Sequence, residues 1–162
     1  MTTADPRTPS ANTVQCASVR IITEDLEPLV RFYAAVTGAT AQWLTDDFVE
    51  LVTPSATVAI SHSRRVSFLG EDSPRAAANN SAIYEFLVED VAALFSRLKA
   101  DFGEALTVMQ PLTMMPWGNM SLLIRDPDGA LLNLYTPVTP EALELQQRRQ
   151  PQLPNGHADD EV

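Results

Sequence analysis

The chain has 162 residues, 45% of them hydrophobic, which is enough for one globular domain or for two small repeated modules. It carries 21 acidic residues against 11 basic ones, and its formal charge of −10 repels nucleic-acid phosphates while it attracts cationic ligands. No apolar run approaches the roughly 20 residues that a membrane-spanning helix needs, so we expect neither a nucleic acid nor a membrane as a partner.

The chain begins with a polar stretch, 1–14, which contains two prolines and lacks the apolar centre of a secretory signal. We therefore expect a disordered tail there. The only cysteine, Cys16, comes directly after this stretch. A single cysteine excludes an intramolecular disulfide and favours a reducing, cytoplasmic location.

A repeat organises the next part of the chain, because residues 18–38 align without a gap with residues 83–103. Each copy starts with a strand-like segment and continues to an aspartate whose carboxylate can accept hydrogen bonds from the first N–H groups of a helix. Apolar residues then recur at helical spacing, and a glycine stands where the helix would end. The strands are expected at 18–23 and 83–88, the N-caps at Asp25 and Asp90, and the C-caps at Gly38 and Gly103.

Three strand-like segments come after each helix, so each copy is predicted to be a βαβββ module. Module 1 covers about 15–62 and module 2 about 82–138, and a polar linker, 63–81, joins them. The strands are expected at 40–45, 47–52 and 56–62 in the first module and at 105–109, 119–125 and 130–136 in the second.

The last two strands of module 2 are joined by Asp126-Pro127-Asp128-Gly129, a strong turn signal because proline presets φ and glycine accepts a positive φ. The C-terminal segment, 139–162, begins with Thr139 and Pro140, which have N-cap and first-turn character. We expect a short helix from 140 to about 149 and a disordered tail after it.

Strand alternation places Arg20 and Glu85 at equivalent positions of the repeat, both on the face away from the helices. Asn133 lies on the corresponding face of the last strand, in a row with Leu131 and Tyr135. Charged groups on central strands are costly unless they are paired or solvated. Arg20 and Glu85 therefore either pair with each other or anchor a polar ligand.

Two motifs gain specificity from the duplicated pattern: DL-x(6)-Y-x(4)-G at 25–38 and DPDG-x-x-x-N at 126–133. Together they resemble the vicinal oxygen chelate superfamily of glyoxalases, extradiol dioxygenases and bleomycin-resistance proteins. Segments 79–90 and 116–129 look most like the bleomycin-resistance branch. The resemblance implies an α+β fold in which two tandem βαβββ modules form a cup-shaped mixed sheet, a single domain at 15–138, and a homodimer.

Many members of this superfamily hold a divalent metal on the cup floor. The resemblance places the ligand positions at Ser18, Ile83 and Asn133, and more loosely at Ala59. Alanine and isoleucine donate nothing, and a neutral hydroxyl and amide are weak ligands, so we expect no metal and no cofactor. His62 could supply one ligand if the strand register shifted, or it could be an ordinary polar residue at a strand end.

Both tryptophans lie where they could contact a ligand. Trp43 is on the strand after the first helix, and Trp117 is in a proline-containing connection with Met114 and Met115. These side chains either bind a flat ligand or pack beneath the loop. The expected ligand-binding residues are Arg20, Trp43, Phe48, Glu85, Met115, Trp117, Asn133 and Tyr135.

Two functions are compatible with these features. The first is a non-catalytic protein that sequesters a small aromatic or cationic, antibiotic-like molecule, which the missing metal ligands and the acidic balance favour. The alternative is an enzyme of the same fold, of lyase, isomerase or dioxygenase type, that uses no metal or unusual ligands. Only in that alternative is a catalytic residue expected, namely Glu85 as a general base, provided that its carboxylate is buried.

Overall fold

The computed structural model describes residues 15–149, so the predicted tails at 1–14 and after 149 lie outside the described residues. The chain divides into two compact units. Unit 1 contains the described residues up to Ser81 together with Asp126–Ala130, and unit 2 contains Ala82–Arg125 and the described residues from Leu131 onward. No helix within residues 15–149 is both long and apolar enough to cross a membrane.

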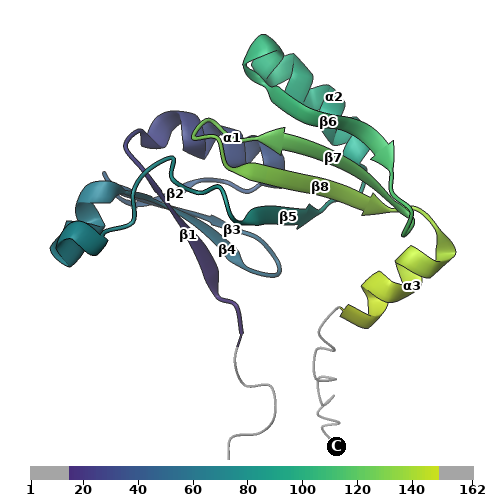
Figure 1. The fold of residues 1–162 in the computed structure, drawn as a ribbon, viewed down its shortest axis with the longest axis horizontal. Helices are drawn as coiled ribbons and strands as arrows, with labels where there is room; N and C mark the ends of the chain where they lie inside the picture. Colours follow the sequence, from purple (N-terminus) through teal and green to yellow (C-terminus); the bar gives the residue numbers. More distant parts are fainter. Residues whose placement is uncertain (1–14, 150–162) are drawn as a thin grey trace, which may run out of the picture. The chain divides into compact units, whose positions relative to one another are not determined.

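Unit 1 is a four-stranded mixed sheet with a helix against one face (Figure 1). The strand order is β1-β4-β3-β2, in which only β1 and β4 run parallel. Its core is formed by the apolar stripe of the helix and the inward residues of β3 and β4, including Leu29, Leu51 and Ile60, all fully buried. The elements are β1 (Ser18–Thr23), α1 (Leu26–Thr37), β2 (Gln42–Thr45), β3 (Phe48–Val52) and β4 (Thr57–His62).

Unit 2 repeats this arrangement with the order β5-β8-β7-β6, and again only the first pair is parallel. The prediction of two tandem βαβββ modules and an α+β fold is therefore confirmed. Leu98 of the helix and Leu122 and Leu134 of the sheet are fully buried. The elements are β5 (Ile83–Leu87), α2 (Val91–Phe102), η2 (Gly103–Ala105), β6 (Thr107–Met114), β7 (Asn119–Arg125), β8 (Leu131–Pro137) and α3 (Pro140–Arg149).

The strand registers confirm which residues of the two modules are equivalent. Arg20 pairs with Ala59 across the parallel β1–β4 ladder, and Glu85 pairs with Asn133 across β5–β8. Since Arg20 and Glu85 are equivalent in the repeat, Ala59 and Asn133 are equivalent as well. The alignment that the sequence supported only loosely is thus correct, and the amide of Asn133 has no polar counterpart in module 1.

Both aspartates occupy the predicted N-cap positions, but only one caps its helix through its carboxylate. The carboxylate of Asp90 accepts hydrogen bonds from the backbone N–H groups of Ala92 and Ala93, both at 3.0 Å. Asp25 occupies the N-cap position of α1, but its side chain makes no capping hydrogen bond. Its backbone N–H instead donates to the hydroxyl of Thr23 at 3.2 Å, so the buried threonine, not the carboxylate, organises this end.

Strand β6 extends to Met114, beyond the predicted range of 105–109. Pro111 favours an earlier end, because proline has no N–H to donate to a strand ladder. The register of the β6–β7 pair shifts between Gln110 and Thr113, and β6 is the edge strand of its sheet. A bulge on an edge strand is a place where proline costs no ladder hydrogen bond, so the strand continues past it.

The expected linker, 63–81, also contains structure, because it begins with a 3₁₀ segment, η1 (Ser63–Asp72), that is kinked at Gly70. His62 caps this helix, since its Nδ1 accepts a hydrogen bond from the backbone N–H of Arg64 at 3.1 Å. Asp47 then holds the first turn through ion pairs of 2.9 Å with Arg64 and 2.7 Å with Arg65. Hydrogen bonds from Arg64, Thr45 and Arg65 hold the pKa of Asp47 far below its ordinary value.

The turn between β7 and β8 is organised by Asp126, whose side chain is only 5% exposed. One carboxylate oxygen accepts the backbone N–H groups of Asp128 and Ala130 at 3.0 and 2.9 Å, and the other accepts the hydroxyl of Tyr33 at 2.8 Å. Burial raises the pKa of Asp126 above its ordinary value of 3.8, although these hydrogen bonds oppose the shift. The turn is therefore a titratable part of unit 1.

This shift predicts how Asp126→Asn changes the pH dependence of stability. The folded protein holds the Asp126 proton more tightly than the unfolded chain does, so this group's contribution is fully present below pH 3.8. This contribution to the free energy of unfolding is lost as the pH rises through the pKa that Asp126 has in the folded protein. In urea unfolding from pH 3 to 7, wild type should therefore lose stability relative to Asp126→Asn over that window. Asp46→Asn, which removes an exposed carboxylate, is the control; a pH-independent difference between wild type and Asp126→Asn would contradict the prediction.

Candidate functional site

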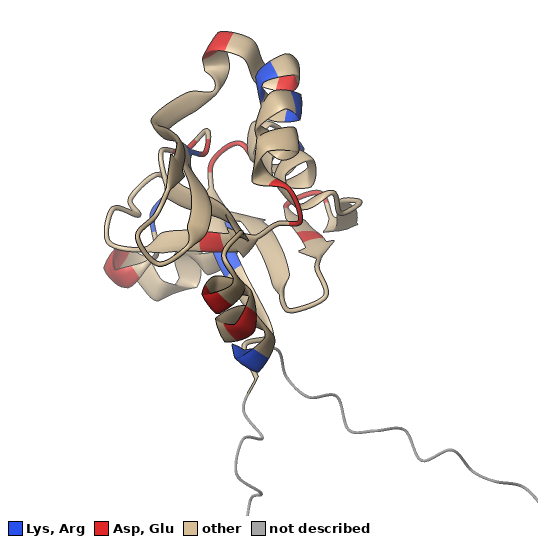
Figure 2. Cartoon of the chain, turned by 90° about the vertical axis from the view of Figure 1, so that its right-hand side faces the viewer, with Lys and Arg blue, Asp and Glu red and all other residues tan. Residues whose placement is uncertain are grey.

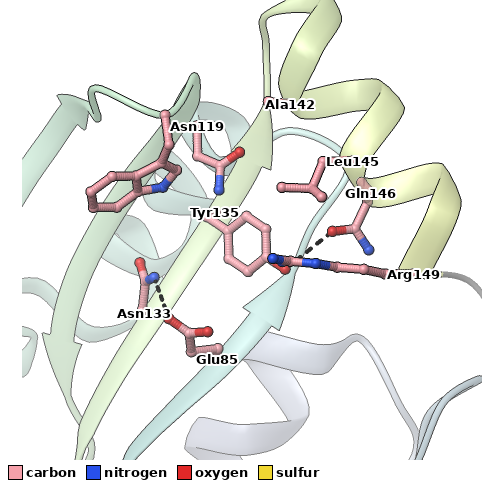
Figure 3. Close-up of a pocket in the computed structure, with 9 residues that line it drawn as sticks. Glu85, Asn119, Asn133, Tyr135, Ala142, Leu145, Gln146 and Arg149 are labelled. Atoms are coloured by element: carbon pink, nitrogen blue, oxygen red, sulfur yellow. Dashed lines mark hydrogen bonds between the residues drawn. The ribbon is translucent and has the colours of Figure 1, made fainter.

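A pocket of about 310 Å³ lies within unit 2, between the open face of the sheet and α3 (Figure 3). We call it the α3 pocket. The sheet contributes residues of β5, β7 and β8, the turn before β7 contributes an indole, and α3 supplies the opposite wall. The lining residues are Glu85, Trp117, Asn119, Asn133, Tyr135, Ala142, Leu145, Gln146 and Arg149.

Strand alternation explains why polar residues of β8 reach the α3 pocket. Leu132 and Leu134 are fully buried on the face that α2 covers, so Asn133 and Tyr135 project from the other face. Because β5 runs parallel to β8 in a fixed register, Glu85 stands directly beside Asn133. The same alternation that builds the core thus places a carboxylate, an amide and a phenol on one surface.

The sheet end of the pocket offers hydrogen-bond acceptors. The Nδ2 of Asn133 donates to a carboxylate oxygen of Glu85 at 3.0 Å, which sets the orientation of the amide because a carboxylate only accepts. The Oδ1 of Asn133 is then buried and has no hydrogen-bond partner within residues 15–149. An unpaired buried acceptor costs about 1–3 kcal/mol, so this oxygen is suited to a donor from a ligand.

The helix end of the pocket offers donors and apolar surface. The hydroxyl of Tyr135 contacts the side-chain oxygen of Gln146 at 3.4 Å. Arg149 projects from the last turn of α3 toward this pair, and Leu145 supplies apolar contact (Figure 3). Figure 2 shows that α3, next to the grey C-terminal trace, carries acidic residues before a basic end, an order that the helix dipole favours.

A close backbone contact ties the loop that carries Trp117 to the start of α3. The carbonyl of Gly118 accepts the backbone N–H groups of Val138 and Thr139 at 2.9 and 3.2 Å. The hydroxyl of Thr139 in turn accepts the N–H of Ala142 at 3.2 Å and caps α3. Gly118 has a φ of +90°, and a Cβ there would lie 2.1 Å from the Thr139 hydroxyl. This position therefore requires glycine, and through it the two walls of the pocket are held together.

The structure brings together four of the eight predicted ligand-binding residues: Glu85, Trp117, Asn133 and Tyr135. Met115 does not line this pocket; its sulfur contacts the amide of Gln110 at 3.7 Å, and its role in binding stays a prediction. The other three belong to unit 1 and lie outside this pocket: Arg20, Trp43 and Phe48.

In unit 1, Arg20 has its own partners. Its guanidinium donates to the hydroxyl of Ser61 at 3.2 Å and lies over the ring of Phe48, 5.0 Å from the centroid. Glu85 likewise has a partner in its own unit, Asn133. Trp43 is 46% exposed on β2. β1 and β5 are the outer strands of their sheets, not central ones as the sequence suggested, and the charge on each is accommodated within its own module.

Sequence reasoning missed three polar residues of the α3 pocket: Asn119, Gln146 and Arg149. Gln146 and Arg149 belong to a stripe with Ala142 and Leu145, at the i, i+3, i+4, i+7 spacing of one helix face. That spacing is visible in the sequence and could have found them. The spacing does not indicate, however, which surface of the protein this helix face packs against.

The residues at the superfamily's metal positions do not fit a divalent metal. Ile83 and Ala59 have no donor atom, and Ser18 and Asn133 offer only a neutral hydroxyl and amide. Within residues 15–149, no three His, Cys, Asp or Glu side chains are grouped so that they could hold an ion. His62 caps η1. The absence of a resident metal and of any cofactor stays a prediction.

Comparison with known proteins identifies the family and agrees with the fold. The family model of the Glyoxalase/Bleomycin resistance protein/Dioxygenase superfamily matches residues 15–134. No curated protein matches the chain.

Three solved structures illustrate the similarity of fold. A glyoxalase/bleomycin resistance protein/dioxygenase from Nocardioides is 17% identical, with 78% of this chain and 85% of that one covered and a TM-score of 0.60. A glyoxalase-related enzyme from Fulvimarina pelagi is 18% identical, with 78% and 94% covered and a TM-score of 0.62. A glyoxalase/bleomycin resistance protein/dioxygenase family enzyme from Burkholderia phytofirmans is 14% identical, with 77% and 100% covered and a TM-score of 0.66.

The contact at Gly118 predicts that Gly118→Ala disturbs the α3 pocket. The added methyl group meets the Thr139 hydroxyl, and alanine also disfavours the positive φ. We expect a loss of about 1–3 kcal/mol in urea unfolding and faster amide exchange across α3. Gly129→Ala is the matched control, because Gly129 has a φ of +87° but open space around its Cβ position. Equal exchange at α3 in both variants would show that the predicted clash has no consequence.

Proposed function

Because the chain belongs to the Glyoxalase/Bleomycin resistance protein/Dioxygenase superfamily, we propose that it is a small-molecule-binding protein of this fold whose ligand occupies the α3 pocket. The observation that carries the proposal is the buried, unpartnered Oδ1 of Asn133 beside the carboxylate of Glu85. A small ligand with N–H donors would satisfy both groups. Binding without turnover, as in sequestration of an antibiotic-like molecule by the bleomycin-resistance branch, is the form we propose.

Size, aromatic surface and charge support this function. A volume of about 310 Å³ is at the lower end of the range for small-molecule sites. Trp117 lines the pocket and is 58% exposed, so its indole is free to stack on a flat ligand. The formal charge of −10 attracts cations over long range. These features favour an aromatic or cationic ligand.

An enzyme of the same fold is the second candidate. One specific observation favours it, namely that similar solved structures from Fulvimarina pelagi and Burkholderia phytofirmans are called enzymes. Glu85 is the only catalytic residue that the sequence suggests, and its side chain is exposed, without the burial on which that role depends. We therefore rank binding above catalysis.

Binding titrations with Trp117→Ala test the proposed function. We expect a planar aromatic cation small enough for the pocket to bind the wild type, and Trp117→Ala to weaken binding by about 1–3 kcal/mol in calorimetry if the indole stacks on the ligand. Trp43→Ala is the matched comparison, because Trp43 is the only other tryptophan and lies outside the pocket. If both variants lose the same binding affinity, the ligand does not bind specifically in the α3 pocket. Turnover of a small substrate would favour the enzyme.

We also propose that the protein is a homodimer, as the family resemblance implies. Exposed apolar residues on the open face of the unit 2 sheet, Ile83 and Leu87, support a partner surface. A stable interface should bury more than about 1,000 Å². Light scattering at micromolar concentration should give twice the chain mass of 17.7 kDa, and a monomer mass would contradict the proposal.

A cytoplasmic location is proposed on the basis of cysteine usage. Cys16 is the only cysteine of the chain, and it is exposed and free. Such a thiol is most compatible with a reducing compartment.

A further inference from the structure

We propose that the α3 pocket selects a zwitterionic ligand, with a cationic N–H donor group against Glu85 and Asn133 and an anionic group against Arg149. This rests on the proposed function, because it assigns the ligand class of the same pocket. The inference comes from three features of the pocket: acceptors gathered at one end, a cation without an ion-pair partner at the other, and no ion pair between the two ends, all within residues 15–149.

The acceptor end suits a cation. One oxygen of Glu85 accepts the Asn133 amide, while its second oxygen has no hydrogen-bond partner among the described residues. The buried Oδ1 of Asn133 is unpartnered as well. Two acceptor oxygens with no protein donor between them match an ammonium or amidinium group, which carries several N–H donors and gains the strength of a charge-assisted bond.

The donor end suits an anion. Arg149 lines the pocket and, among residues 15–149, has no ion-pair partner, whereas its neighbour Arg148 pairs with Glu144. The two arginines are adjacent on the same turn of α3, yet only Arg149 belongs to the stripe that faces the sheet. A guanidinium in such a position can bind a carboxylate through two parallel hydrogen bonds.

The charges at the two ends of the pocket do not pair with each other. Each is therefore available to a ligand group of opposite charge. Glu85 and Arg149 line one pocket from opposite walls without forming an ion pair (Figure 3). A ligand with a single charge would pair with one of them and cover the other, at the cost of partly desolvating an unpaired ion. A zwitterion pairs with both. Trp117 and Leu145 then provide contact for an apolar or aromatic body between its charges.

Probes of closely similar shape that carry both charges or only one of them test this selection. One set is L-phenylalanine, the cation L-phenylalaninamide and the anion N-acetyl-L-phenylalanine. A second set, with a larger charge separation, is 4-(aminomethyl)benzoic acid, 4-(aminomethyl)benzamide and 4-methylbenzoic acid. Titrations by ligand-observed NMR should show that the zwitterion of at least one set binds about tenfold more tightly than both of its singly charged analogues, as expected when one charge of the pocket would otherwise lose its partner.

Two charge variants assign each end. Arg149→Gln should abolish the preference, because the zwitterion loses its anion partner and the cationic analogue no longer covers an unpaired arginine, so that the two bind with similar affinity. Glu85→Gln should act in the same way at the other end of the pocket, so that the zwitterion and the anionic analogue bind with similar affinity. Arg148→Gln, on the same turn of α3, and the exposed Glu104→Gln are controls that keep the preference for the zwitterion. Arg149→Lys keeps the charge and should keep the preference for the zwitterion. This variant shows whether the effect of Arg149→Gln comes from the lost charge or from a disturbed end of α3.

The outcomes distinguish the two levels of inference. If cationic probes bind as tightly as the zwitterions and Arg149→Gln changes nothing, the zwitterion proposal is wrong and the binding function stands. If neither probe set nor the aromatic cations tested with Trp117→Ala bind at all, both proposals are wrong. If Arg149→Lys loses the preference for the zwitterion as Arg149→Gln does, the positive charge at position 149 is not what binds the anionic group of the ligand, and that assignment is wrong.

Discussion

The hydrogen bond from the Tyr33 hydroxyl to the buried Asp126 carboxylate is the contact that holds the turn between β7 and β8 against α1. It joins residues 93 positions apart, and the same buried carboxylate holds two backbone N–H groups of its own turn. The turn therefore belongs to unit 1, while the strands on either side of it belong to unit 2. The turn brings β8 back beside β7, and the ladders with β5 and β7 then fix the positions of Asn133 and Tyr135 along β8.

The two modules have the same sheet topology but use the open face of the sheet differently. At equivalent positions, module 1 has Arg20 beside Ala59, and module 2 has Glu85 beside Asn133. Arg20 packs on Phe48 and bonds to Ser61, whereas the Glu85–Asn133 pair keeps an unsatisfied oxygen. The segments after the last strand of each module also differ, because β4 continues into η1 while β8 leads to α3, which lines a pocket over the sheet. The duplicated fold thus carries the α3 pocket in unit 2 because the chain continues differently after each copy.

The pocket depends on α3. Local sequence signals predict where this helix begins, but they do not predict in which direction it runs. Thr139 and Pro140 predict where α3 begins, and the observed helix starts at Pro140. Nothing in those residues indicates that the helix turns back over β8. The direction is decided at the open end of the β7–β8 hairpin, where the carbonyl of Gly118, just before β7, accepts the N–H groups of Val138 and Thr139, just after β8. Glycine is required for that approach, and it also orients the turn that carries Trp117.

The sequence by itself determined the duplicated βαβββ pattern, most element bounds and the face on which Glu85 and Asn133 lie. These features depend on helical and strand periodicity and on turn chemistry, which act between near neighbours. Tertiary structure decided that β6 continues past Pro111 and that Arg149 joins the pocket. Each of these depends on hydrogen bonds or packing between groups whose distance along the chain carries no periodic signal, so only the folded chain brings them together.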